Sequence, residues 1–168
     1  MSLQWREKMS VGNDLIDDDH RSLIDTINQA EESWKTKNRA NLMVVLDRLS
    51  EYSMLHFSRE ESVAIAAGYP GTAQLHEAHD ELVKKLDQFK KEIGEEWTVS
   101  SGQKFNAFLR DWLIGHVIQE DMLMKPFLEK FSPRFVPRLI RSMTSVQPQF
   151  PPQQRDCAAA APEPDPAP

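Results

Sequence analysis

The sequence has little that would suit the chain to an oxidising compartment or to a membrane. It contains one cysteine, so no disulfide can form within the chain, and a reducing cytoplasm is the expected location. Its opening, MSLQWREKMS, is too polar for the apolar region of a secretory signal. No apolar run approaches the roughly 20 residues that a bilayer crossing needs. We therefore expect a chain that neither spans a membrane nor depends on disulfides.

Positive charge is also scarce. The chain carries 20 lysine and arginine residues against 26 aspartate and glutamate residues, which gives a formal net charge of −6 at pH 7. No block of basic residues stands out along the sequence. Proteins that bind nucleic acid depend on such blocks to neutralise phosphate, so we exclude nucleic acid as a partner.

Proline is common in only one part of the chain. Seven of the 11 prolines lie between Pro148 and Pro168, in a stretch whose apolar content is mostly alanine. Proline locks backbone angles and removes amide donors, and such a composition builds no packed face. Residues 146–168 are therefore predicted to be a disordered tail with Cys157 as an exposed thiol. This tail is a candidate tether for a protein partner, and the folded domain is expected over residues 1–145.

Upstream of the tail, apolar residues recur three and four apart, and almost no stretch alternates as a strand would. The pattern predicts helices over residues 18–37, 39–67, 72–93 and 101–125, a shorter helix over 134–143, and an N-terminal arm over 1–14. Short connections force each helix to turn back along its neighbour. The expected fold is all-α, an antiparallel up-down-up-down four-helix bundle.

The histidines of the chain are distributed over all four long predicted helices: His20, His56, His76, His79 and His116. His56 and Glu60 are four residues apart and share a helix face. His76 and His79 are three residues apart and also share a broad face. The placement of the histidines is therefore more informative than their number.

Asp121 needs a local adjustment to face the same way as His116. It follows His116 by five residues, which places it about 140° away around an ideal helix. Either the carboxylate reaches back, or the helix loosens into a π-type turn, a feature often found at functional sites.

A shared metal site is the simplest account of these residues. A single buried histidine is usually satisfied by a neighbour, but five buried imidazoles would leave several polar groups unpaired. Imidazoles with carboxylates suit iron, manganese or zinc, whereas metals that prefer thiolate are disfavoured because the only cysteine lies in the tail. The sequence thus predicts a metal site inside the bundle.

A series of short motifs runs in order along residues 5–130. It comprises Trp5, residues 10–20 (SVGNDLIDDDH), 56–61 (HFSREE), 68–70 (GYP), 76–79 (HEAH), 112–116 (WLIGH) with Asp121, and 126–128 (PFL). In order and separation this composite resembles the bacteriohemerythrins, hemerythrin-like proteins with a non-haem di-iron centre inside a four-helix bundle.

The resemblance implies two iron ions and the side chains that hold them. His76, His79 and His116 would bind one iron, His20 and His56 the other, and Glu60 and Asp121 would bridge both beside an oxo or hydroxo group. An apolar lining would keep water and anions out of the oxygen pocket: Leu23, Phe57, Trp112, Leu113 and Val117. The implied function is reversible dioxygen binding for oxygen storage, sensing or delivery.

One departure from the family pattern lies in the third helix, where the family's histidines are typically four residues apart. If His79 anchors the register, Leu75 has replaced a ligand and His76 points elsewhere. If His76 occupies the usual place, the helix must wind more tightly or start later. Because spacings of three and four share one broad face, we expect both histidines to bind. The alternative is an opened site, with water in place of one imidazole, or a site with a single metal.

Other functions stay open at this point. A di-iron enzyme that reduces peroxide, oxygen or nitric oxide is one alternative, and an iron store or a structural metal bundle is another. Five histidines with two carboxylates favour binding over oxidation, whereas an opened third-helix position would favour turnover. No separate general acid or nucleophile stands out near the motifs, so no catalytic residue is predicted.

Overall fold

The computed structural model describes residues 2–95 and 99–141, and all regular structure within these ranges is helical. Three long helices are α1 (Asp14–Lys35), α2 (Arg39–Ala67) and α3 (Thr72–Glu95). The fourth column is α4 (Val99–Arg110), which continues through the π-helical segment η2 (Asp111–Gly115) into α5 (His116–Gln119). Short segments complete the described chain: η1 (Glu7–Met9), η3 (Asp121–Leu123), α6 (Lys125–Leu128) and α7 (Arg138–Arg141).

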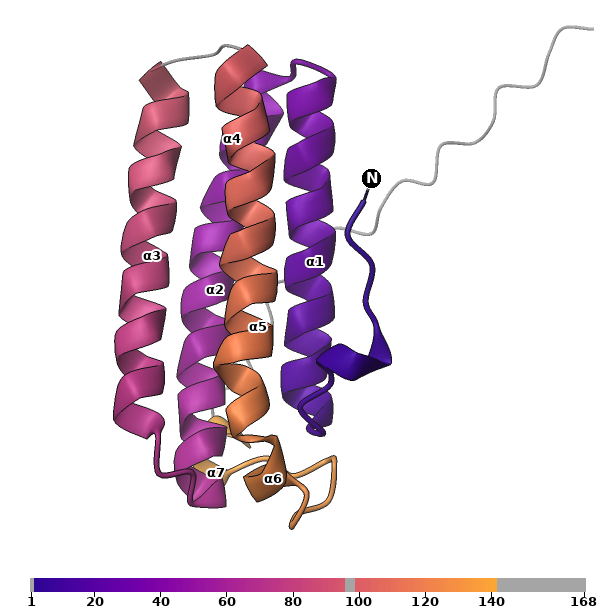
Figure 1. Ribbon diagram of the computed structural model, residues 1–168, viewed down its shortest axis with the longest axis vertical. Helices are drawn as coiled ribbons and strands as arrows, with labels where there is room; N and C mark the ends of the chain where they lie inside the picture. The colour runs from indigo at the N-terminus through magenta and orange to yellow at the C-terminus, as the bar shows by residue number, and fades with distance from the viewer. Residues whose placement is uncertain (1, 96–98, 142–168) are drawn as a thin grey trace, which may run out of the picture.

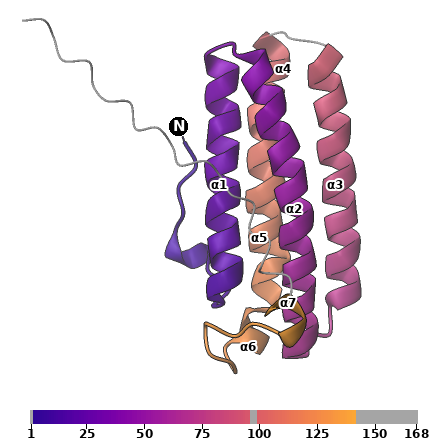
Figure 2. The same cartoon turned by 180° about the vertical axis from the view of Figure 1, so that it is seen from behind.

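The long helices form the expected antiparallel four-helix bundle (Figure 1). Residues 36–38 connect α1 to α2, and residues 68–71 connect α2 to α3, so each helix returns along its neighbour. The reverse view shows α6 and α7 gathered at one end of the bundle (Figure 2). Within the two described ranges, no helix combines the length and the apolar character that a membrane crossing requires.

The helix ends follow from local capping. The Asn13 side chain accepts a hydrogen bond from the Ile16 amide, so α1 begins at Asp14 and not at residue 18 as predicted. Gly68 adopts a left-handed conformation with a φ of 74° and ends α2 at the predicted residue. The last column stops at Gln119 and not at residue 125, and the predicted C-terminal helix over 134–143 covers only residues 138–141 of the described chain.

Two apolar clusters hold the bundle together. The larger contains Leu49, Leu86, Phe105 and neighbouring buried residues of all four columns. The smaller is defined by these buried residues: Val11, Ile16, Val63, Ala64, Ala67, Leu75, Met124, Leu128 and Ile140. Burial of apolar surface is the dominant favourable term in folding, so these clusters position everything that lies between them.

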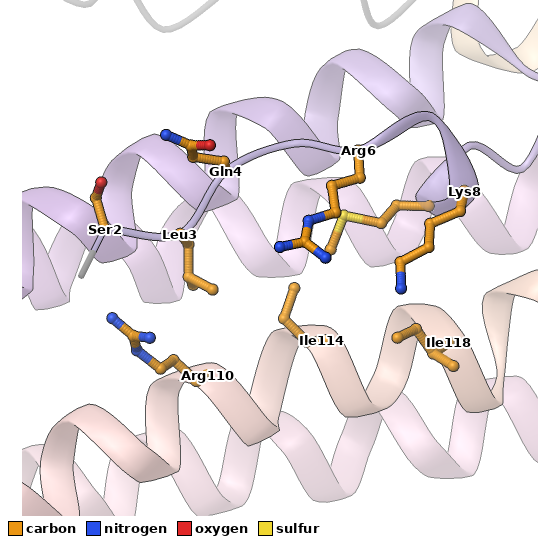
Figure 3. A pocket seen from close by; sticks show the side chains of 9 residues that line it. Ser2, Leu3, Gln4, Arg6, Lys8, Arg110, Ile114 and Ile118 are labelled. Carbon is orange, nitrogen blue, oxygen red and sulfur yellow. The ribbon is translucent and has the colours of Figure 1, made fainter.

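The N-terminal arm packs against the bundle. The Leu3 backbone exchanges two hydrogen bonds with the Asn28 side chain, at 2.7 and 2.9 Å. Met9 and Val11 are buried, and the Arg21 guanidinium lies 4.5 Å from the centroid of the half-buried Trp5 ring. A groove of about 480 Å³ separates the arm from Arg110, Ile114 and Ile118 (Figure 3). The predicted tail over 146–168, including Cys157, lies outside the described residues.

Candidate metal centre

Six of the predicted metal ligands meet in one buried group, which we call the polar cluster. Its members come from every column of the bundle: His20 of α1, His56 and Glu60 of α2, His79 of α3, His116 of α5 and Asp121 of η3. None of the six is more than 7% exposed. Along their helices, His20, Glu60, His79 and Asp121 each lie between members of the two apolar clusters. The polar cluster is therefore a layer enclosed by apolar packing above and below.

Glu60 lies among three imidazoles. Its Oε2 atom is 3.1 Å from His79 Nε2 and 3.7 Å from His56 Nε2. Its Oε1 atom is 3.9 Å from His20 Nε2. The Glu60 carboxylate therefore faces histidines of α1, α2 and α3 together.

Asp121 also lies between two imidazoles of the cluster, those of His116 and His20. Its Oδ1 atom is 2.9 Å from His116 Nε2, and its Oδ2 atom is 3.3 Å from His20 Nε2. His116 Nε2 lies in turn 3.0 Å from His79 Nε2. Donor atoms within 4.8 Å of one another form two groups: Glu60, His79, His116 and Asp121 in one, and His20, His56 and Glu60 in the other.

Many polar atoms of the cluster have no hydrogen-bond partner among the described residues. These atoms are both ring nitrogens of His20 and of His56, Glu60 Oε1, and both carboxylate oxygens of Asp121. Buried polar atoms are nearly always paired, because leaving one unpaired costs about 1–3 kcal/mol. Imidazole nitrogens and carboxylate oxygens that converge without partners are the donor set that iron, zinc or manganese takes, so the residues fit a metal pair.

Burial and close contacts shift the pKa values of the titratable side chains in the cluster. Burial, reinforced by the nearby Asp121, raises the pKa of Glu60 to about 8. Burial favours the neutral acid at Asp121 too, but His116 and His20 outweigh it and hold the pKa of Asp121 well below its usual range. Burial lowers the pKa of His56 and of His79 to about 4 each. Both are thus neutral imidazoles near pH 7, the form that binds a metal.

Two carboxylates outside the cluster face the outer nitrogens of its histidines. Glu61 Oε1 accepts a hydrogen bond of 2.8 Å from His79 Nδ1. Asp19 Oδ2 lies 3.5 Å from His56 Nδ1, while its Oδ1 accepts hydrogen bonds from Tyr52 and Arg59. Sequence analysis missed both roles. Asp19 precedes His20 in the sequence and Glu61 follows Glu60, and this adjacency to predicted ligands was the signal available.

The structure places His76 outside the polar cluster, which differs from our expectation that both histidines of the third helix face the metal. The His76 side chain is 61% exposed, and its Nδ1 atom contacts the Glu61 carboxylate at 3.1 Å. His79 anchors the register, and Leu75, one turn earlier, is 2% exposed within the smaller apolar cluster. A step of three residues leaves His76 about 60° from His79 around the helix axis, and on that side it faces solvent and Glu61 and not the centre.

Asp121 reaches the cluster through a break in the helix. Helix α5 ends at Gln119, and Glu120, with φ −109° and ψ −57°, leads into the short turn η3. This break brings the carboxylate back to His116, as one of our two alternatives required. A π-helical segment is present too, but it lies before His116, over Asp111–Gly115, and not between the two ligands.

The predicted apolar lining is buried, and all five residues belong to the larger apolar cluster: Leu23, Phe57, Trp112, Leu113 and Val117. The Phe57 ring stacks on His79 with centroids 4.0 Å apart and planes inclined by 13°. It also meets His116 edge to face at 5.7 Å. Phe57 therefore covers the two imidazoles on one side and limits the approach of water.

A surface pocket of about 350 Å³ reaches the cluster between α3 and the last column. His116, Trp112 and Gly115 line it together with charged residues that include Glu81 and Glu120. A Cβ atom at Gly115 would meet nothing within 4 Å, so this glycine leaves open space beside His116. The groove beside the N-terminal arm, in contrast, is lined by none of the six donors.

Comparisons with known proteins agree with this geometry. The hemerythrin HHE cation binding domain matches residues 11–128. A bacteriohemerythrin from Methylococcus capsulatus is 32% identical over 114 residues, which cover 67% of this chain and 85% of the relative. One from Stenotrophomonas maltophilia is 28% identical over 119 residues, covering 71% and 76%.

A crystal structure of wild-type hemerythrin superposes with a TM-score of 0.68 at 29% identity, covering 76% of this chain and 98% of that one. The matched family region, residues 11–128, contains all six residues of the polar cluster and the helices that supply them. Since it also spans most of the described chain, the chain belongs to the hemerythrin HHE cation binding domain family.

Proposed function

We propose that this protein binds dioxygen reversibly at a non-haem di-iron centre formed by the polar cluster. The observation that carries the proposal is the convergence of four imidazoles and two carboxylates, all buried and largely without other partners. Membership of the hemerythrin family supports iron as the metal and dioxygen as the ligand. Whether the protein stores, senses or delivers oxygen depends on its affinity and on its partners.

The proposed ligand set has two halves that share their carboxylates. His79 and His116 would hold one iron, and His20 and His56 would hold the other. Glu60 and Asp121 each face both halves and would hold both ions. His76 takes no part, so the set has one imidazole fewer than the resemblance implies.

Two ferrous ions, when bound, supply the electrons that dioxygen takes up on binding. The residues of the chain set the charge around the metal pair and the access of water to it. Glu60 and Asp121 balance the positive charge of the metal pair, and Phe57 with the rest of the apolar lining excludes water and anions. Exclusion of water matters because it lets a bound gas leave again unchanged.

A second candidate is an enzyme that reduces dioxygen or peroxide with electrons from an external reductant. The observation that favours it is Leu75, which stands in the apolar cluster one turn before His79 where a further imidazole would otherwise approach the metal. With fewer protein ligands, more coordination positions on the iron would be free for a substrate. This candidate predicts consumption of oxygen, whereas carriage predicts its release.

One experiment separates the two candidates. The protein is loaded anaerobically with ferrous iron, the metal is counted per chain, and the visible spectrum is recorded while air is admitted and then removed. Carriage predicts two irons per chain and a charge-transfer band that appears and disappears with oxygen over repeated cycles. Bleaching with rapid loss of dissolved oxygen supports the enzyme, and a count below two contradicts the shared di-iron centre.

A further inference from the structure

We propose that Glu61 is a positioning residue for His79 and that the exposed His76 holds Glu61 in place. The inference rests on the proposed function only in taking His79 as a metal ligand. It assigns a role to the one histidine that the metal centre does not use, and it concerns how the centre is held and not what it binds.

The His79 ring is held at both ends. Its Nδ1 atom lies 2.8 Å from Glu61 Oε1, and its Nε2 atom lies 3.1 Å from Glu60 Oε2 inside the cluster. When Nδ1 carries the ring proton and donates it to Glu61, the lone pair of Nε2 faces the metal position. A carboxylate behind a ligating histidine fixes both the tautomer and the orientation of the ring.

His76 contacts Glu61 from the solvent side. Its Nδ1 atom lies 3.1 Å from each oxygen of the Glu61 carboxylate, so the imidazole faces both oxygens at once. The His76 side chain is 61% exposed and that of Glu61 is 24% exposed. The contact therefore forms where the α2–α3 interface opens to solvent. A free glutamate there would rotate, and pairing with His76 restricts it to the rotamer that meets His79.

The other half of the cluster shows a looser, buried counterpart, in which Asp19 Oδ2 lies 3.5 Å from His56 Nδ1 without a hydrogen bond between them. Asp19 stands behind His56, and the hydroxyl of Tyr52 and the guanidinium of Arg59 hold its Oδ1 atom at 2.7 and 2.9 Å. His76 thus does for Glu61 what Tyr52 and Arg59 do for Asp19. Each half of the cluster thus has an anchored carboxylate behind one of its histidines, which supports a positioning role for Glu61.

The apolar Leu75 makes this support more important. Within the described part of α3, His79 is the only side chain that enters the polar cluster. No second ligand from α3 fixes the helix relative to the metal. Glu61 and His76 tie α3 to α2 beside His79, so they supply a constraint that a further ligand would otherwise provide.

The test uses cobalt(II), whose visible bands report coordination, added to the metal-free full chain. Glu61→Leu should weaken one of two binding steps by about 10- to 100-fold, the range that loss of such an outer partner causes. Glu61→Gln retains an oxygen that accepts the Nδ1 proton, so it should recover much of the loss. His76→Leu should give a smaller loss in the same step, and, as an exposed substitution, it should leave folding intact.

Matched controls lie on the same helices. Glu51 of α2 and Gln74 of α3 are exposed, and Glu51→Leu and Gln74→Leu should bind cobalt as the unmodified chain does. Nitrogen-15 spectra of the metal-free chain provide a second measurement. They should show His79 protonated at Nδ1, with a mixture of tautomers in Glu61→Leu but not in the controls.

The inference is overturned if Glu61→Leu binds both cobalt ions with unchanged affinity, or if Glu61→Gln is as weak as Glu61→Leu. Equal losses in Glu51→Leu would overturn it too. Failure of the proposed function looks different: the unmodified chain would then bind two metals normally but would not release oxygen. Cobalt affinity and the His79 tautomer report on Glu61 in either case.

Discussion

His76 and His79 lie three positions apart in α3, yet one imidazole is exposed and the other is buried. His79 is 2% exposed and enters the polar cluster, whereas the His76 side chain is 61% exposed. Helical spacing placed the two on one broad face, and at that level both were equally good ligands. The difference arises from Leu75 and Glu61. Leu75 is buried in the smaller apolar cluster, and its packing sets the rotation of α3. Glu61 contacts His76 on the solvent side of the α2–α3 interface.

Substitution of these two histidines should have opposite effects on metal content. His79→Leu removes a donor of one group, so at saturating ferrous iron the count should fall below two per chain. His76→Leu should still bind two irons per chain, because the exposed His76 side chain contacts Glu61 and is not a member of the polar cluster. Metal analysis after gel filtration measures both. Loss of iron in His76→Leu at saturation, or its retention in His79→Leu, would contradict the ligand set.

Leu75→His should make folding more dependent on metal. An imidazole at this buried position has no partner in the metal-free chain, which should cost about 1–3 kcal/mol of unfolding free energy. If the new ring reaches the iron held by His79 and His116, metal binding recovers that cost. Thermal unfolding with and without iron should therefore show a larger metal-induced rise in Tm than the unmodified chain shows. Leu75→Gln is the control, and an equal rise in both variants would count against the open position.

At the level of elements, the last column of the bundle does the most to shape the site. The π-helical turn over Asp111–Gly115 precedes His116, and the break after Gln119 returns Asp121 to it. Sequence analysis predicted one continuous helix over this region, with a choice between a π turn and a carboxylate that reaches back. Spacing could not place the π turn, because its position depends on how Trp112 and Leu113 pack against the neighbouring helices.

Gly115 should control access through the pocket beside His116. Gly115→Leu would fill part of this space, so the reduced, iron-loaded protein should react more slowly with dioxygen in a stopped-flow measurement. Gly115→Ala adds only a Cβ that meets no neighbour, so it should keep the rate and stabilise the helix by about 0.5–1 kcal/mol. Unchanged rates in Gly115→Leu would show that the gas enters elsewhere.

At the scale of the whole molecule, the polar cluster is a layer of titratable side chains between two apolar ones. The bundle can fold around it because most of its stabilisation comes from the apolar clusters at either side. In the metal-free chain this layer holds protons instead of metal. Metal binding must displace them, since only neutral imidazoles and ionised carboxylates are ligands.

Metal affinity should therefore rise with pH. Glu60, with a pKa of about 8, is protonated near pH 7 in the metal-free chain, and although burial opposes it, Asp121 raises the pKa of His20 and of His116. Binding releases these protons, so the apparent cobalt affinity should increase from about pH 6 through about pH 8 and level off only above that pH. Titrations at fixed ionic strength, with a pH indicator to count released protons, measure this. A flat profile would contradict the protonated state of Glu60.

The sequence by itself determined the four-helix bundle and the ends of its second helix, and it predicted five of the six donors as metal ligands. Periodicity specifies helices, short connections specify their antiparallel order, and the separations among His20, His56, Glu60, His116 and Asp121 match a known family pattern. Only the tertiary structure decided between His76 and His79, because that choice depends on the rotation of α3 against its neighbours. Packing of Leu75 sets this rotation, and no local pattern contains it.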